Sequence, residues 1–403
     1  MEALAGWTIY AFSLFAAIII AKTIFNAFRP DLDEIPGPFL SRFTTWPLKI
    51  SVLTGHRTAY IHQLHQKYGA YVRIGPREIA IADLNAAQQI HKVGTRFRKS
   101  EWYQNQTTTQ ATDDTCGVFG IRGLAEARRR RKYFQQAGTK AIVMEWEPMI
   151  ISTIDVTVSK IKRDASQGEE DIMKWWTMMT ADILGSLAFG EPFRMIEYEQ
   201  KPQLIKDIED AMIAVGIKLE LPLLYWLLNW TPIPAVRRLM RVADRLRDAG
   251  YKAVENTKRA SQEGFKTLFS KMYPEDGTQP FSDDLMADEA SNIIIAGTDT
   301  TAMTLTYLVY EVLQNPGIKT KLLKELEPCS ADPRVGELEE KQYLNNVIQE
   351  TLRLHSAVPA SLPRTVPAEG AVFGGYHIPA GYTVSTQAYT LHRNPHVWAD
   401  PEK

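Results

Sequence analysis

The segment IIIAGTDTTAMTL, residues 293–305, combines two features that are hard to reconcile in one helix. It is apolar enough for a protein core, yet a glycine, an aspartate and three threonines stand at its centre. Ser282 is a suitable N-cap ahead of it, and Asn315-Pro316-Gly317 is a suitable stop. The sequence therefore predicts a single helix of about 33 residues, roughly 50 Å long.

The polar residues at the centre of this helix need a physical reason. A glycine inside a helix costs about 1 kcal/mol relative to alanine, and a buried aspartate costs more unless it has partners. A threonine hydroxyl can donate to the carbonyl four residues earlier, and Gly297 allows another group to approach the backbone closely. A functional groove would explain the pattern, but so would a polar face turned to solvent.

Composition narrows the possible classes of protein. The chain has 403 residues, of which 45% are hydrophobic and 23% charged, and its formal net charge is −1. This charge gives no general attraction to nucleic acid, so no nucleic-acid partner is expected. The two cysteines, Cys116 and Cys329, lie far apart without CxxC spacing, which argues against a disulfide framework or a zinc module.

The N-terminus predicts a membrane anchor. LAGWTIYAFSLFAAIIIA, Leu4 to Ala21, contains no charge and would form a helix of roughly 27 Å, close to the thickness of a bilayer core. Basic residues follow this segment, so the remainder of the chain should face the cytosol. We expect an anchor in residues 1–29, a proline-rich hinge in 30–40 and one domain in 41–403. A buried helix of a soluble protein is the alternative.

The rest of the chain is predicted to be mainly α-helical with a small β lobe. KYGAYVRIGPREIAIAD, from Lys67, alternates around a Gly-Pro pair like a β-hairpin, and FGGYHIPAGYTVST, from Phe373, has two turn signals. The β lobe would therefore be assembled from both ends of the chain. Segments with helical periodicity are 124–145, 171–189, 203–216, 235–262 and 282–314.

A second motif favours a functional explanation of the first motif over a polar face turned to solvent. In NNVIQETLRLHSAVPASLPRTVP, Glu350 and Arg353 lie three residues apart, a spacing that alone indicates only a surface ion pair. AGTDTT in a long helix, then ETLR, then PR before a β-hairpin, then HRNPHVW from His392 resemble in order and spacing the haem-thiolate monooxygenases of the cytochrome P-450 superfamily. The anchor and hinge resemble those of its membrane-bound members, in particular the fungal biosynthetic ones. The resemblance covers essentially the whole chain.

The resemblance implies roles for seven residues. Asp299 and Thr300 would help to deliver protons on the distal side of the haem, and Gly297 would open space beside it. Glu350 and Arg353 would form a buried structural pair on the proximal side.

Two arginines would bind haem propionates by the same resemblance. They are Arg364 in the PR element and Arg130 in EARRRRKYF. Glu126 stands where related sequences often have a tryptophan or a histidine. The arginine run would otherwise be a solvated basic face, which could also dock an acidic reductase.

One departure from the family concerns the iron ligand. The resemblance implies a cysteine thiolate in an FxxGxxxCxG loop downstream of the ETLR motif, and these 403 residues contain no such loop. Neither Cys116 nor Cys329 stands in that motif, so both are expected to be incidental thiols. We therefore expect a P-450-like fold without its C-terminal part, without a protein metal ligand, and inactive by itself.

The function that this resemblance implies is an NADPH-dependent monooxygenase. It would insert one oxygen atom into a small lipophilic molecule, in secondary metabolism, with haem as cofactor and electrons from a flavoprotein reductase. The expected location is the endoplasmic reticulum membrane, with a single span and the domain in the cytosol. A detoxifying monooxygenase and a non-catalytic membrane-anchored remnant are the alternatives.

Overall fold

The chain is arranged as two compact units, and each is described by itself. The computed structural model describes residues 7, 14, 17–18, 21–25, 27–28, 30–106, 112–113, 115–137, 139–200, 203–262, 264, 267–269, 281–330 and 332–402. The first unit comprises Met1–Ser100 and Pro359–Lys403, and the second comprises Glu101–Val358. Both ends of the chain thus contribute to one unit, while its middle forms the other.

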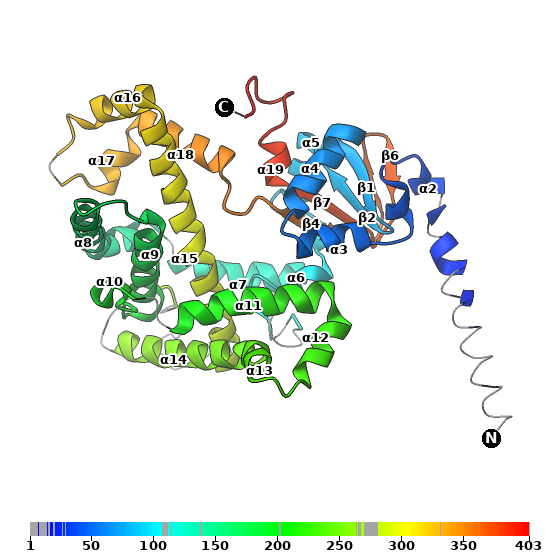
Figure 1. Ribbon diagram of the computed structural model, residues 1–403, viewed down its shortest axis with the longest axis horizontal. Helices are drawn as coiled ribbons and strands as arrows, with labels where there is room; N and C mark the ends of the chain where they lie inside the picture. Colours follow the sequence, from blue (N-terminus) through cyan, green and yellow to red (C-terminus); the bar gives the residue numbers. More distant parts are fainter. Residues whose placement is uncertain are drawn as a thin grey trace. The chain divides into compact units, whose positions relative to one another are not determined.

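The first unit contains the β-sheets. Its elements are α2 (Pro30–Asp33), a 3₁₀ turn η1 (Phe39–Arg42), α3 (Trp46–Leu53), α4 (Arg57–Tyr68), β1 (Tyr71–Gly75), β2 (Glu78–Ile81), α5 (Leu84–His91), β3 (Arg98–Lys99), β4 (Ser361–Thr365), β5 (Ala371–Phe373), β6 (Tyr376–Ile378), β7 (Thr383–Gln387) and α19 (Ala388–Leu391). The five-stranded sheet has the order β1-β2-β7-β4-β3, and β5 pairs with β6. β7 and β4 from the C-terminal part of the chain lie between β2 and β3 from the N-terminal part, and Figure 1 shows strands of both parts side by side in blue and orange-red.

Both predicted β segments are confirmed. β1 and β2 form the antiparallel hairpin expected from residue 67 onward, and β2 then pairs in parallel with β7 from the other end of the chain. The β5–β6 turn places Gly374 at φ +58° and Gly375 at φ +85°, a left-handed backbone that glycine adopts without strain. Apolar side chains such as Ile79, Ile378 and Val384 are fully buried between the sheet and its neighbours.

The second unit is helical. Its elements are α6 (Glu101–Asn105), α7 (Leu124–Ala137), α8 (Lys140–Ala165), α9 (Ile172–Phe189), α10 (Met195–Tyr198), α11 (Gln203–Glu220), α12 (Pro222–Asn229), α13 (Pro234–Met240), α14 (Val242–Gln262), α15 (Asp283–Gln314), α16 (Pro316–Leu326), α17 (Val335–Glu339) and α18 (Gln342–Leu354). Figure 1 shows α15 in yellow as the long helix on which α9 and α14 lie. Trp175, Phe189 and Met286 belong to the core between these helices.

Sequence periodicity predicted five helical segments in this unit, and the structure divides two of them. The predicted helix 282–314 is confirmed as Asp283–Gln314, with the Ser282 hydroxyl accepting the Leu285 N–H. The predicted helix 124–145 is wrong as a single element, because Thr139 adopts an extended backbone between α7 and α8. The predicted helix 235–262 is interrupted at Arg241, where α13 ends.

The predicted membrane anchor falls mostly on residues outside the described set, so it stays a prediction. Among the helices of the described residues, none combines the length and the apolar composition needed to cross a bilayer.

Glycine permits the close approach of α14 to α15. A Cβ on Gly250 would lie 2.5 Å from the Ala287 carbonyl oxygen and 3.0 Å from its carbonyl carbon. Both atoms belong to the backbone, so neither can move away by a change of side-chain rotamer. The two helices could accommodate any larger residue only by moving apart.

We therefore predict that Gly250→Ala lowers the free energy of unfolding by about 1–3 kcal/mol, because the overlap exceeds the gain in helix propensity. Gly216→Ala in α11 is the matched control, since a Cβ there meets nothing within 4 Å. The control should be neutral or stabilising by up to about 1 kcal/mol. Urea denaturation followed by circular dichroism measures both, and equal effects would disprove the close-packing argument.

Candidate active site

The centre of α15 has two distinct faces. Ile294, Thr298 and Ala302, spaced four residues apart, are buried, whereas Ala296 and Asp299 are exposed. The aspartate that seemed costly in an apolar helix is therefore on the outer face. The helix presents a carboxylate to its surroundings and packs its apolar side on the core.

Thr300 lies next to Asp299 and is partly exposed. Its hydroxyl donates to the Ala296 carbonyl at 2.6 Å, as the sequence predicts for a threonine at this position. A hydroxyl that donates in this way keeps lone pairs that can accept a hydrogen bond from a proton donor. Asp299 and Thr300 thus place an acid and an oriented hydroxyl at consecutive positions of one helix.

Gly297 has a neighbour that sequence reasoning missed. A Cβ at this position would lie 3.0 Å from Leu184 Cδ2 of α9, so the glycine permits close packing of α15 on α9. The Thr180 hydroxyl of α9 donates to the Thr298 carbonyl at 3.0 Å at the same crossing. Helix packing is sufficient to explain the glycine, and its role beside a cofactor stays a prediction.

Glu350 and Arg353 form a bidentate ion pair on α18. Arg353 Nε and Nη2 donate to the two carboxylate oxygens of Glu350 at 2.8 and 2.7 Å. The side chain of Arg353 is only 6% exposed, whereas that of Glu350 is 48% exposed. The predicted pairing is present, and the arginine is the buried partner.

Three residues that the sequence analysis did not select attach this helix to α15. His355 follows α18 and stacks on the ring of Tyr307, with ring centroids 4.1 Å apart and planes 3° from parallel. His355 Nε2 also lies 2.8 Å from Glu311 Oε1. No local sequence pattern marks this contact, because Tyr307 and His355 are 48 residues apart in the sequence.

Arg130 on α7 is buried, while its neighbours Arg128, Arg129 and Arg131 are exposed. The arginine run is therefore a solvated face with one member turned inward. Arg130 Nε donates to Glu126 at 2.6 Å, and its two terminal nitrogens donate to backbone carbonyls. Its predicted contact with a cofactor stays a prediction. All three nitrogens of the guanidinium already donate to acceptors of the protein.

Arg364 lies on β4 of the first unit, where it pairs with Val384 of β7. Its guanidinium donates to the Pro363 carbonyl at 3.2 Å. Burial, followed by the positive charge of Arg364, lowers the pKa of His91 to about 4. Arg364 is thus close enough to His91 for its charge to disfavour the protonated imidazole.

The two cysteines occupy different environments. Cys116 is fully buried with Ile121 and Ala127, and burial raises the pKa of its thiol to about 11. Cys329 is partly exposed, and neither takes part in a disulfide. Burial therefore keeps the Cys116 thiol protonated at neutral pH.

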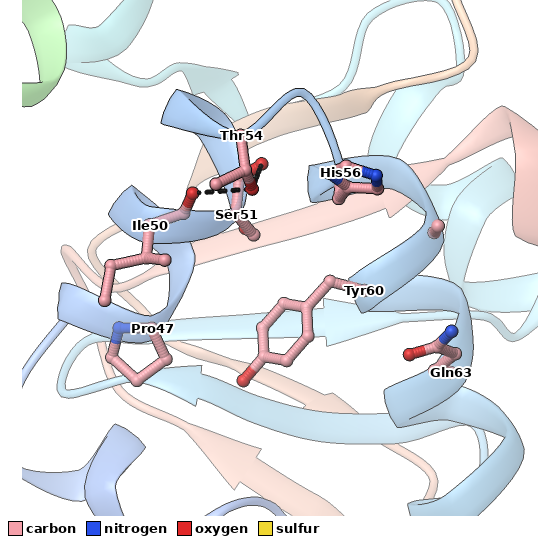
Figure 2. A pocket seen from close by; sticks show the side chains of 8 residues that line it. Pro47, Ile50, Ser51, Thr54, His56, Tyr60 and Gln63 are labelled. Atoms are coloured by element: carbon pink, nitrogen blue, oxygen red, sulfur yellow. Dashed lines mark hydrogen bonds between the residues drawn. The ribbon is translucent and has the colours of Figure 1, made fainter.

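A separate cavity of about 440 Å³ lies between α3 and α4. Figure 2 shows the ring of Tyr60 and the side chain of Ile50 on its walls. Its lining residues are Pro47, Ile50, Ser51, Thr54, His56, Ala59, Tyr60 and Gln63. Burial raises the pKa of Tyr60, so its phenol stays protonated. The lining contains no carboxylate or thiol. The motif residues Asp299, Thr300, Glu350 and Arg353 lie on α15 and α18 instead.

Comparison with known proteins agrees with this arrangement of motifs. The family model for cytochrome P-450 matches residues 36–403. The chain is 31% identical to the cytochrome P-450 monooxygenase tazI of Aspergillus terreus, over 96% of this chain and 79% of that one. It is 34% identical to the cytochrome P-450 monooxygenase stcB of Emericella nidulans, over 95% and 74%, and 28% identical to the methylphloroacetophenone oxidase of Cladonia uncialis, over 95% and 87%. This chain belongs to the cytochrome P-450 family.

The family implies haem, and the described residues fit part of that group. In the first unit, the guanidinium of Arg364 would suit a carboxylate of the porphyrin. In the second unit, the outer face of α15 offers the Thr300 hydroxyl. Cys116 is a buried thiol and Cys329 lies in the turn after α16, and the expectation that neither is the iron ligand stays a prediction. Within the described residues, no three His, Cys, Asp or Glu side chains gather in an arrangement that could hold a metal ion.

The pKa of His91 gives a pH-dependent prediction. The unfolded chain takes up a proton on this histidine near pH 6.5, whereas the folded chain does so only near pH 4. Stability should therefore be complete above pH 6.5 and should fall as the pH drops from 6.5 to 4. His91 is only partly buried, so the loss should be about 1–2 kcal/mol after solvent screening.

His91→Gln should remove this component of the pH dependence. The measurement is the urea midpoint at pH 7.5 and at pH 5 for the wild type and the variant. His377→Gln, at an exposed position on β6, is the control. An unchanged pH dependence in His91→Gln would show that His91 is protonated normally in the folded state.

Proposed function

We propose that this protein is a monooxygenase of the cytochrome P-450 family that inserts one oxygen atom into a small lipophilic molecule. The observation that carries the proposal is the outer face of α15, where Asp299 is exposed beside the oriented hydroxyl of Thr300. The family match over residues 36–403 supports it.

Two residues of α15 would handle protons in this reaction. Thr300 Oγ1 can accept a hydrogen bond from a proton-bearing group while its own O–H donates to the Ala296 carbonyl. Asp299 is exposed, so its carboxylate can exchange protons with water and pass them to the group that the Thr300 hydroxyl orients. The pair would form a short relay from solvent to the reacting oxygen.

Three other residues would hold the cofactor or support its site. Haem, when bound, supplies the oxygen chemistry that side chains cannot perform. Arg364 would take a propionate, because a guanidinium offers two parallel N–H donors to a carboxylate. Glu350 and Arg353 would stiffen α18, since two of the three guanidinium nitrogens donate to one carboxylate of the same helix.

The electron donor that we propose is an NADPH-dependent flavoprotein reductase. Arg128, Arg129 and Arg131 form an exposed basic face on α7 that an acidic partner could approach. Long-range attraction of this kind accelerates encounter more than it strengthens binding, which suits a transient electron-transfer partner.

A membrane surface is the second partner that we propose, at the endoplasmic reticulum and with the domain in the cytosol. The uncharged segment 4–21 supports an anchor, and the second unit adds a surface of its own. Between Glu220 and Asp244 the sequence has three arginines and no acidic residue. Large apolar side chains exposed over the same stretch are Leu223, Leu224, Trp226, Leu227, Trp230 and Ile233. Exposed tryptophans beside arginines are typical of surfaces that enter the lipid interface.

The substrate class follows from the relatives and is proposed only coarsely. Several related fungal proteins are monooxygenases by name, and one is a methylphloroacetophenone oxidase. We therefore favour the biosynthesis of a secondary metabolite over the detoxification of a foreign aromatic. Comparing metabolites of strains with and without the gene separates these two roles.

The proton relay is tested with the chain joined to a family cysteine loop, so that an iron ligand is present. Thr300→Ala should retain haem, but its product formation per NADPH should fall on the order of 10²-fold, with hydrogen peroxide rising instead. Thr304→Ala is the matched control, because Thr304 makes the same kind of bond one turn later, to the Thr300 carbonyl. Equal product yields for both variants would remove Thr300 from the relay.

Residues 1–403 expressed alone give a separate prediction. Because neither Cys116 nor Cys329 stands in the family's cysteine loop, haem added to this polypeptide should show no thiolate-type spectrum after reduction with carbon monoxide. Cys116→Ser and Cys329→Ser should leave that result unchanged. A thiolate spectrum lost in either variant would identify an unexpected ligand and would exclude the alternative of a non-catalytic, membrane-anchored remnant.

A further inference from the structure

Arg130 is the centre of a network that the monooxygenase motifs do not explain. It is 2% exposed, although it belongs to a run of four arginines. Its Nε donates to Glu126 Oε1 at 2.6 Å, one turn earlier on α7. Its Nη2 donates to the Asp113 carbonyl at 2.6 Å, and its Nη1 donates to the Cys116 carbonyl. Each of the three guanidinium nitrogens therefore has an acceptor.

Glu126 is an ionised partner at this site. Both of its carboxylate oxygens accept hydrogen bonds from Arg129, at 2.7 and 2.8 Å, and one of them also accepts from Arg130. Hydrogen bonds from Arg129, and then from Arg130, lower the pKa of Glu126 to about 2. Glu126 therefore offers Arg130 a permanent carboxylate from its own helix.

The other side of the same loop is held by α15. The Gly117 N–H donates to Asp288 Oδ2 at 2.6 Å, and the Val118 N–H donates to Glu289 Oε1 at 2.7 Å. The Cys116 carbonyl and the Gly117 N–H belong to one peptide unit. That unit has a guanidinium at its oxygen and a carboxylate at its hydrogen, which is the favourable direction for the peptide dipole.

The packing around this peptide leaves no room for a side chain at Gly117. A Cβ there would lie 2.4 Å from Asn292 Nδ2, 2.8 Å from Glu289 Oε2 and 3.0 Å from Asp288 Oδ2. The glycine lets the two carboxylates reach the backbone amides directly. The Asn292 side chain donates to Asp288 Oδ2 at 3.2 Å and so steadies one of them.

We propose that Glu126, Arg130 and Asp288 form a clamp on the Cys116–Gly117 peptide, in which Glu126 is the built-in carboxylate ligand of Arg130. Arg130 then positions residues 115–118 against α15 and does not bind a carboxylate of the cofactor. Asp288 precedes Asp299 by 11 residues on the same helix, so the clamp fixes the segment about three turns before the proton relay. The part of this inference that concerns the cofactor rests on the proposed function.

The clamp itself is tested without cofactor, by hydrogen exchange of the Gly117 and Val118 amides in the full chain. Arg130→Gln should accelerate exchange about tenfold or more, because the charged donor to the Cys116 carbonyl is lost. Arg128→Gln, an exposed member of the same run, should leave the exchange unchanged. Unchanged protection in Arg130→Gln would overturn the clamp.

Glu126→Ala provides a second variant in case Arg130→Gln does not fold. It should also accelerate exchange of these amides, and added formate should restore their protection by taking the place of the lost carboxylate. Formate should have no effect on the wild type, in which Glu126 already occupies the place beside Arg130. It should also have no effect on Arg130→Gln, in which the guanidinium that would bind formate is missing. Failure of formate to restore protection in Glu126→Ala would show that Glu126 is not an anionic ligand of Arg130.

The cofactor part is tested by comparing hemin with hemin dimethyl ester, which lacks free carboxylates. The preference of the full chain for hemin over the ester should be the same in the wild type and in Arg130→Gln. A preference that falls about tenfold in Arg130→Gln would restore Arg130 as a propionate ligand and would overturn this part of the inference. If the chain joined to a family cysteine loop binds neither porphyrin, the haem assignment in the proposed function fails, and hydrogen exchange alone decides the clamp.

Discussion

The close approach of α9 and α14 to α15 is the constraint on which the rest of the helical unit depends. Gly250 brings α14 within contact distance of the Ala287 carbonyl, and Gly297 brings Leu184 of α9 against α15. At the second of these contacts, the Thr180 hydroxyl of α9 donates a hydrogen bond to the Thr298 carbonyl. A helix held this closely on two sides cannot rotate without creating overlaps, because protein interiors are packed as densely as organic crystals. Its outer face therefore has a fixed direction.

Three regions along α15 place polar or aromatic side chains for different purposes. Its first turns hold residues 117–118 through two carboxylates, its centre presents Asp299 and Thr300, and its last turns meet His355 through Tyr307 and Glu311. The two carboxylates near its start are tolerable because backbone N–H groups satisfy them. The polar residues of one helix thus have different explanations, and only the central ones need a catalytic role.

Sequence reasoning succeeded where the controlling interaction was local. The N-cap at Ser282, the hydroxyl bond of Thr300 to Ala296 and the pairing of Glu350 with Arg353 each involve residues no more than four apart. It failed at Thr139 and Arg241, where hydrophobic periodicity continues across a change in backbone direction. The clamp around Gly117 could not be predicted, because Asp288 and Glu289 lie 171 residues away from their amide partners.

The two arginines assigned to the same role by motif show why environment decides function. Arg364 donates to the Pro363 carbonyl beside it, and its positive charge contributes to the low pKa of His91. Arg130 has an ionised glutamate on its own helix, and that glutamate stands where relatives often place a tryptophan or a histidine. A neutral aromatic at that position would leave the guanidinium in need of an external anion, whereas Glu126 satisfies it from within. A change at one neighbouring residue is therefore sufficient to convert an anion-binding arginine into a structural one, while the arginine itself remains the same.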